Sequence, residues 1–337
     1  MSSGGFVFYH QRQNKAVERQ LFIDLLVKVN RSLPISEYSY VSFGGTYFED
    51  FKLMHSYFDS MNMFSIESEK IVYQRQLFNT PYSCISVNNT VSSSFITDYN
   101  QDANSILWLD FADSRAHREQ LGEFESFLTK AWSGDIVKIT LNANPGALVD
   151  GSQTNKVTGK RYLADELNQA RLDKLKTRIE DFLPKNVTPN DMKKDSYPAL
   201  LHNVIKYVSS KAMASRPDST VFQPLTSFYY SDSGNQMMTM TGAILEEERV
   251  KSFIDETKLA NWNLSTLEWG SCKKISVPPL TSKEKSFIDQ MLPNSSTSDI
   301  IDALGFSFAE DDKLNQEMVE GYRQYYRYYP SFHKVTF

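Results

Sequence analysis

The sequence contains few of the residues that commonly mark a disulfide-rich, metal-binding or membrane protein. Its only cysteines are Cys84 and Cys272, too few for a disulfide framework or a cysteine zinc site. The five histidines show neither HxxxH nor HxH spacing, so we predict no metal site. No segment approaches the ~18 consecutive apolar residues of a transmembrane helix, and the N-terminus lacks the apolar stretch of a signal peptide. We therefore expect a cytoplasmic protein with reduced thiols and no membrane partner.

The charge balance also argues against some functions. The chain has 36 Lys and Arg against 41 Asp and Glu, which gives a formal net charge of −5. This acidic balance argues against broad binding to a polyanion such as nucleic acid. A hydrophobic content of 41% is enough for a sizeable core and excludes global disorder. At 337 residues we expect one large domain with additions, or two domains.

Glycine-rich phosphate loops are absent as well. Neither the G-x-G-x-x-G fingerprint of dinucleotide-binding proteins nor a P-loop occurs in the sequence. A pyrophosphate would need more glycine than the single pair Gly44-Gly45 provides. The sequence therefore favours a nucleoside-containing ligand without a pyrophosphate.

Short apolar segments alternate with helical patterns over the first half of the chain. The helical patterns place apolar residues three or four positions apart. Such alternation predicts a mainly parallel α/β sheet with right-handed crossovers. We expect strands at residues 38–43, 61–66, 83–87, 105–109 and 135–141, and helices at residues 14–29, 47–59, 70–78 and 118–132.

The second half of the chain adds a hairpin and more helices. Residues 219–230 and 236–245 flank the turn SDSGN and predict an antiparallel hairpin, which completes a seven-stranded mixed sheet. Further helices are expected at residues 162–182, 197–211, 282–291, 297–304 and 311–326. We predict an N-terminal helical segment (1–37), a ligand-binding core (38–145 and 219–246), a helical insertion (146–218) and a helical C-terminal region (247–337).

The main functional signal is a glycine turn followed by an acidic residue. The turn lies in YVSFGGTY, residues 40–47, directly after the first predicted strand. Such a turn lets the backbone approach a ligand, and an acidic residue ending the second strand, here Glu67, can accept both ribose hydroxyls. The spacing from Gly45 to Glu67 is 22 residues, close to the ~20 of Rossmann-type nucleoside sites. The alternative is an ordinary turn with a solvated Glu67.

At these residues the chain resembles the Rossmann-like methyltransferases that depend on S-adenosylmethionine, over about residues 38–246. More specifically, it resembles the bacterial family of putative O-methyltransferases. The matching stretches are NKAVERQLFIDLL, SFGGTYFEDFKLMH, SIE, WLDFAD and YRQYYRYYPSF. The resemblance implies a Rossmann-like methyltransferase fold, S-adenosylmethionine as cofactor, and O-methyl transfer to an acceptor that the sequence does not identify.

The resemblance also implies a role for each matching position. The glycine turn would lie under the methionine part of the cofactor, Glu67 would hold the ribose, and one of two asparagines would lie near the adenine. The residues concerned are Phe43, Gly44, Gly45, Thr46, Tyr47, Glu67, Asn88, Asn89 and Asp110. Aromatic faces at Phe43, Tyr47 and Phe111 would favour the positively charged sulfonium. The turn departs from the usual motif, because Ser42 stands where an acidic residue often lies and only two glycines remain.

Two aspartates after the fourth strand are the candidate catalytic residues. Asp110 would face the transferred methyl group, and Asp113 follows three residues later. An oxygen nucleophile usually needs a general base or a metal, and either aspartate could serve. Asp113 could instead cap the next helix. Arg12, Asn14 and Lys15, at the start of the first helix, are weaker candidates for substrate contact and could simply cap and solvate that helix.

Two alternatives stay open at the level of the sequence. The thin glycine motif also suits a catalytically silent member of the fold that binds a nucleoside ligand or acts with a protein partner in an assembly. The C-terminal stretch YRQYYRYYP mixes arginine with aromatic residues that can stack on bases, which suits a nucleic-acid methyltransferase. The net negative charge makes nucleic acid the less favoured partner.

Overall fold

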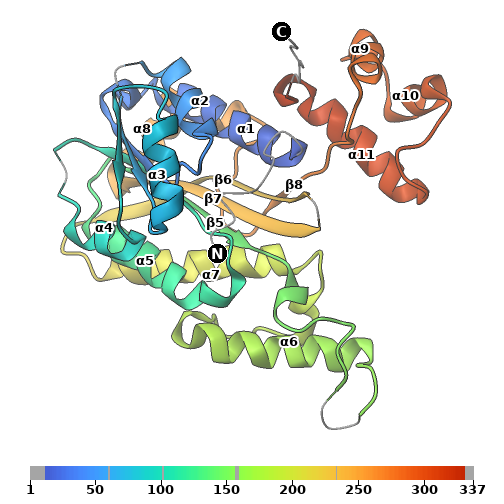
Figure 1. Cartoon of the computed structure of the whole chain (residues 1–337), viewed down its shortest axis with the longest axis horizontal. Helices are drawn as coiled ribbons and strands as arrows, with labels where there is room; N and C mark the ends of the chain where they lie inside the picture. Colours follow the sequence, from blue (N-terminus) through green and yellow to red (C-terminus); the bar gives the residue numbers. More distant parts are fainter. Residues whose placement is uncertain (1–11, 60, 101, 156–158, 233, 331–337) are drawn as a thin grey trace. The chain divides into compact units, whose positions relative to one another are not determined.

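The computed structural model describes residues 12–59, 61–100, 102–155, 159–232 and 234–330 (Figure 1). The strands are β1 (Ser39–Ser42), β2 (Asn62–Ile66), β3 (Ile85–Asn88), β4 (Ser105–Asp110), β5 (Ile136–Asn142), β6 (Thr220–Asp232), β7 (Asn235–Glu246) and β8 (Lys273–Ile275). The helices are α1 (Gln13–Val29), α2 (Glu49–Tyr57), α3 (Lys70–Asn79), α4 (Ser92–Asp98), α5 (His117–Lys130), α6 (Ala164–Ile179), α7 (Tyr197–Ala214), α8 (Val250–Thr257), α9 (Ser282–Met291), α10 (Thr297–Leu304) and α11 (Asp312–Tyr325).

The described strands form one sheet in the order β3-β2-β1-β4-β5-β7-β6-β8. The pairs β1–β2, β2–β3, β1–β4 and β4–β5 are parallel, and β5 pairs with β7 in antiparallel register. The order 3-2-1-4-5 is that of a doubly wound nucleotide-binding sheet. The predicted Rossmann-like methyltransferase fold is therefore confirmed, and the sheet has the short strand β8 in addition to the seven strands expected.

The burial pattern of each strand explains its place in the sheet. All of β4 except its last residue is buried, and so is all of β5 except its last residue, since helices cover both faces of the centre. At the edge, β3 has one buried residue in four. Figure 1 shows α5 and α7 on one face of the sheet and α2 and α3 on the other. The core between the sheet, α5 and α7 contains Leu107, Phe124, Ile139, Val204 and Met240.

Contacts divide the described chain into two compact units. The first contains residues 25–229 and 235–273 and holds most of the sheet. The second contains residues 12–24, 230–234 and 274–330. The predicted insertion 146–218, with α6 and α7, falls inside the first unit. The finer division into four segments stays a prediction.

Within the second unit, tyrosines of the C-terminal region bond to neighbouring backbone and side chains. The hydroxyl of Tyr322 donates to Asp289 at 2.6 Å, that of Tyr325 to the carbonyl of Lys274 at 3.0 Å, and that of Tyr329 to the carbonyl of Pro278 at 3.0 Å. These rings therefore hold α9, α11 and the segment after β8 together. Among the described residues, no helix is long and apolar enough to cross a bilayer.

Candidate functional site

The strand register places the predicted cofactor residues at one level of the sheet. Ser42 of β1 is aligned with Ser65 of β2 and with Trp108 of β4. Gly44, Glu67 and Asp110 each lie two residues further, beyond the carboxyl ends of these three strands or at the last residue. This edge is where ligands bind in open α/β sheets. The residues predicted from three separate strand ends thus lie at one level of this edge.

The glycine turn is tightly packed and has left-handed backbone. Gly45 has a φ of 54°, which a glycine adopts without steric cost. A Cβ on Gly44 would lie 2.7 Å from Oγ of Ser65 and 2.8 Å from the ring of Phe48. The amide of Phe48 donates to the carbonyl of Gly44 at 3.1 Å and leads into α2. Both glycines are therefore required by the local structure, and Thr46 beside them is buried.

Glu67 and the asparagines form the second part of the site. The Glu67 side chain is 8% exposed, and its carboxylate accepts the amide of Glu69 at 2.8 Å. Burial raises the pKa of this carboxyl above its ordinary value of 4.5. The Asn89 side chain donates to the carbonyl of Glu67 at 2.8 Å, whereas the buried Nδ2 of Asn88 has no hydrogen-bond partner among the described residues. An unsatisfied amide beside a buried carboxylate is suited to a polar ligand.

Aromatic rings meet between the glycine turn and the loop after β4. The ring centroids of Phe43 and Phe111 are 5.6 Å apart, so the predicted aromatic faces of these two residues lie together. Asp110 ends β4 next to this pair and is partly buried. Tyr47, three residues after Gly44, is also partly buried.

Asp113 has the capping role that was the alternative to catalysis. Its carboxylate accepts the amide of Arg115 at 2.9 Å at the start of the 3₁₀ turn Ser114–Ala116. It also pairs with the Arg115 guanidinium at 2.8 Å. Hydrogen bonds from Arg115 lower the pKa of Asp113 to about 2, which makes this carboxylate a weak base. Its predicted catalytic role stays a prediction that this pairing does not favour.

Three side chains that the sequence did not single out hold the loop after β4. Asn142 donates to the carbonyl of Ala112 at 3.3 Å, Gln120 to that of Asp113 at 2.8 Å, and Arg178 to that of Ser114 at 2.8 Å. They come from β5, α5 and α6, so the loop is anchored by the sheet and by the helical insertion. The stretch NANP, residues 142–145, follows the fifth predicted strand and by sequence predicts only a turn. Arg178 carried no sequence signal.

The weaker candidates for substrate contact, Arg12, Asn14 and Lys15, lie in the second unit. Asn14 and Lys15 lie in the first turn of α1. Asn14 and Lys15 donate their backbone amides to Asp232 at 3.3 and 2.9 Å. The Asn14 side chain donates to the carbonyl of Ser231 and accepts the amide of Val277 at 2.9 Å. Asn14 and Lys15 are buried and Arg12 is partly buried. Their contact with substrate stays a prediction.

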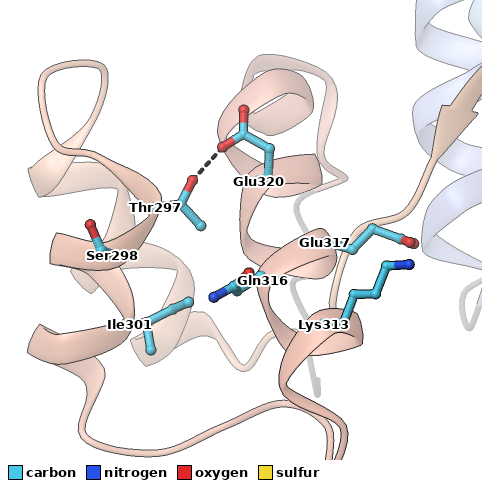
Figure 2. A pocket seen from close by; sticks show the side chains of 7 residues that line it. All are labelled: Thr297, Ser298, Ile301, Lys313, Gln316, Glu317 and Glu320. Atoms are coloured by element: carbon cyan, nitrogen blue, oxygen red, sulfur yellow. Dashed lines mark hydrogen bonds between the residues drawn. The ribbon is translucent and has the colours of Figure 1, made fainter.

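A groove of about 480 Å³ lies between α10 and α11 of the second unit (Figure 2). Polar and charged side chains line it, and Thr297 donates to Glu320 across it. None of the predicted cofactor residues lines this groove. Among the described residues there is also no cluster of three or more His, Cys, Asp or Glu side chains that could hold a metal ion.

The fold and the site together define a Rossmann-like protein of the methyltransferase type. The chain belongs to the family described as "Putative O-methyltransferase", whose model matches residues 7–337. This membership places it among the S-adenosylmethionine-dependent methyltransferases and confirms the resemblance seen in the sequence. A search among curated proteins finds no match.

Similar solved structures include Trm1 and two O-methyltransferases, all with low sequence identity. Trm1 from Pyrococcus horikoshii, in complex with S-adenosyl-L-methionine, is 12% identical, with 74% of this chain and 59% of that chain covered and a TM-score of 0.41. The O-methyltransferase from Bacillus cereus, in complex with SAH, is 10% identical, with 68% and 80% covered and a TM-score of 0.34. TomG from Streptomyces achromogenes, an O-methyltransferase involved in tomaymycin synthesis, is 12% identical, with 69% and 89% covered and a TM-score of 0.35. The family model therefore establishes the family, and the strand order establishes the fold.

Proposed function

We propose that the first unit binds S-adenosylmethionine at the carboxyl ends of β1, β2 and β4 and transfers its methyl group to an oxygen of an acceptor. The observation that supports this most is the common level of Gly44, Glu67 and Asp110. The unsatisfied Nδ2 of Asn88 beside the buried Glu67 adds a donor that a nucleoside base would satisfy. The residues present therefore fit the cofactor of the family.

Each part of the site would contact a different part of the cofactor. Glu67 would accept the ribose hydroxyls, because an ionised carboxylate has only acceptors to offer. Asn88 would donate to the adenine, and Asn89 keeps the end of β2 in place through its bond to the Glu67 carbonyl. The turn at Gly44 and Gly45 allows the methionine part to approach the backbone.

The cofactor supplies an electrophilic methyl group on a sulfonium that is its own leaving group. The protein therefore has to align the acceptor oxygen with the methyl group and to accept its proton. The rings of Phe43 and Phe111 offer faces that attract a cation. Asp110 is the better candidate for the proton acceptor, since Asp113 is paired with Arg115.

A thermal-unfolding series tests this function. Saturating S-adenosylmethionine or S-adenosylhomocysteine should raise the melting temperature by about 5 °C, while NAD should leave it unchanged. The Asp110→Asn variant should keep most of this shift and lose the conversion of S-adenosylmethionine to S-adenosylhomocysteine with a panel of hydroxyl-bearing acceptors. An equal shift with NAD, or none with either cofactor form, would contradict the proposal.

A catalytically silent member of the family is the second candidate. The weakly basic Asp113 and the two-glycine turn are the observations that favour it. The silent protein would show the same thermal shift with no consumption of cofactor over a broad acceptor panel.

We further propose the cytoplasm as the compartment, since Cys84 and Cys272 are both free thiols.

A further inference from the structure

A chain of buried polar groups lies beneath the glycine turn. The backbone amide of Gly44 donates to Oγ of Ser65 at 3.1 Å, and this hydroxyl donates to Oε1 of Gln76 at 2.9 Å. Ser65 lies in β2 and Gln76 in α3, and both are 0% exposed. We call these three groups the turn relay. It connects a covering helix, through the sheet, to the backbone of the candidate cofactor site.

The turn relay is expected to lower the stability of the fold, because it buries polar groups. Polar groups buried in a packed interior destabilise a protein when they are not fully hydrogen bonded. Here Nε2 of Gln76 has no partner among the described residues, and neither has Oγ of the neighbouring Ser42. Apolar side chains would fill the same space without that cost. The relay is therefore difficult to explain by stability alone.

The relay fixes the direction of one peptide group at the turn. Gly44 has its amide held by Ser65 and its carbonyl held by the amide of Phe48 at 3.1 Å. Because the peptide groups on both sides of Gly44 are held, the backbone enters the left-handed conformation of Gly45 in one defined orientation. The hydroxyl of Ser65 is close enough that a Cβ on Gly44 would lie 2.7 Å away, so the turn is pressed against the relay.

We propose that Ser65 and Gln76 are positioning residues that hold the glycine turn in its cofactor-binding shape. The first strand ends in the neutral Ser42, and the turn has only two glycines. A neutral relay from α3 supplies the support instead. A turn ordered before binding loses less conformational entropy when the ligand arrives. This inference rests on the proposed function, because it concerns the same site.

A double-mutant cycle tests the relay. Ser65→Ala should weaken S-adenosylmethionine binding about tenfold, and Gln76→Met, which keeps the side-chain size, about threefold. The double variant should bind about as weakly as Ser65→Ala alone, because Gln76 acts only through Ser65. Ser209→Ala is the matched control, since Ser209 is also 0% exposed but its hydroxyl donates within its own helix, to the carbonyl of Lys206 at 3.0 Å. Unchanged affinity in Ser65→Ala, or effects of the two substitutions that multiply, would overturn the proposal.

A ligand-free measurement separates failure of the relay from failure of the proposed function. In protein labelled with ¹⁵N-glycine, the Gly44 amide proton should move upfield in Ser65→Ala and, by a smaller amount, in Gln76→Met, while Ser209→Ala leaves it in place. A Gly44 resonance that is unaffected by both relay substitutions would overturn the relay. If both variants show the shifts but the native protein binds no S-adenosylmethionine, the proposed function is overturned and, with it, the cofactor role given to the relay.

Discussion

At the scale of single residues, the pKa values of the Glu67 and Asp113 carboxyl groups are shifted in opposite directions. Burial raises the pKa of Glu67, whereas hydrogen bonds from Arg115 lower the pKa of Asp113 to about 2. The carboxyl group of Glu67, which we propose as the ribose ligand, is therefore protonated at a higher pH than that of Asp113 after β4.

The raised pKa of Glu67 predicts how cofactor binding depends on pH. The ribose hydroxyls need acceptors, and protonation of Glu67 removes one. Affinity for S-adenosylmethionine should thus fall on acidification, with an onset above the ordinary carboxyl pKa of 4.5. Calorimetric titration at each pH measures this affinity. Glu67→Gln is the reference protein, because protonation changes of the ligand's own amino group affect both proteins equally and cancel in the comparison. Parallel pH profiles for the two proteins would contradict the role of Glu67.

Residues also mark the limit of what the sequence predicts. Gly44, Glu67 and Asp110 could be found because each follows an apolar strand, where ligand contacts gather. Gln76 could not be found in this way, because α3 buries the face that contains Gln76 and exposes the face that contains its apolar residues Ile71 and Phe78. Ile71 and Phe78 are 75% and 91% exposed, while Gln76 is 0% exposed. Hydrophobic periodicity places such a glutamine at the surface, and only the fold shows it beneath the glycine turn.

At the scale of elements, helix α1 shows how distant segments complete a helix end. The first turn of α1 contains no acidic residue of its own. Asp232, from the end of β6, accepts the amides of Asn14 and Lys15 and the side-chain amide of Asn14 at 3.0 Å. These bonds satisfy amides that every helix leaves unpaired at its start.

This long-range cap predicts a loss of stability. Asp232→Ala should lower the free energy of unfolding by about 2 kcal/mol, because three donors lose their acceptor. Asp311→Ala is the control, since Asp311 caps α11 locally through one bond to the amide of Leu314 at 2.7 Å. It should cost about 1 kcal/mol. Denaturant unfolding measures both, and an equal loss in the two variants would contradict the larger role of Asp232.

The main elements follow from the sequence, and the short ones do not. The predicted helices at 282–291 and 297–304 match α9 and α10 residue for residue, because Thr281 and Ser296 form capping boxes that define their starts. Strand β8 and helices α4 and α8 were missed. β8 and α4 are three and seven residues long, too short for a clear period, and α4 begins with three serines. Helix α8 has the same length as α10, eight residues, but no side chain caps its start.

At the scale of the whole molecule, buried neutral histidines link stability to pH. His202 is 1% exposed, its Nε2 accepts the amide of Gly270 at 3.1 Å, and its Nδ1 donates to Ser227 at 2.9 Å. His117 is equally buried. Burial lowers the pKa of both to about 4 from the ordinary 6.5.

These shifts predict acid sensitivity in a defined range. Between about pH 6.5 and 4 the unfolded chain binds protons that the folded histidines do not, so stability decreases as the pH falls through this window. For His202 the full effect is about 3 kcal/mol. Unfolding in denaturant at several pH values measures it, and His202→Gln should show a shallower decrease than the native chain. A slope identical in the two proteins would contradict the assignment.

The class of the sheet could be predicted from the sequence, but the division of the molecule could not. Alternating apolar strands and helices followed by a hairpin predict a mainly parallel sheet with an antiparallel pair, whereas the strand order comes from the structure. The second unit instead combines residues 12–24, 230–234 and 274–330, which are far apart in the chain. Contacts such as Asn14 with Val277 carry no local sequence signal.

Binding of S-adenosylmethionine to the native chain, compared with two carboxylate variants, tests the central claim most directly. Calorimetric titration should show one saturable site in the native protein and a dissociation constant about thirtyfold higher in Glu67→Ala, because a charge-assisted acceptor is lost. Glu69→Ala removes the same charge two residues away and should change the affinity less than about twofold, since it keeps the backbone amide that donates to the Glu67 carboxylate. No binding by the native protein, or native affinity in Glu67→Ala, would contradict the account.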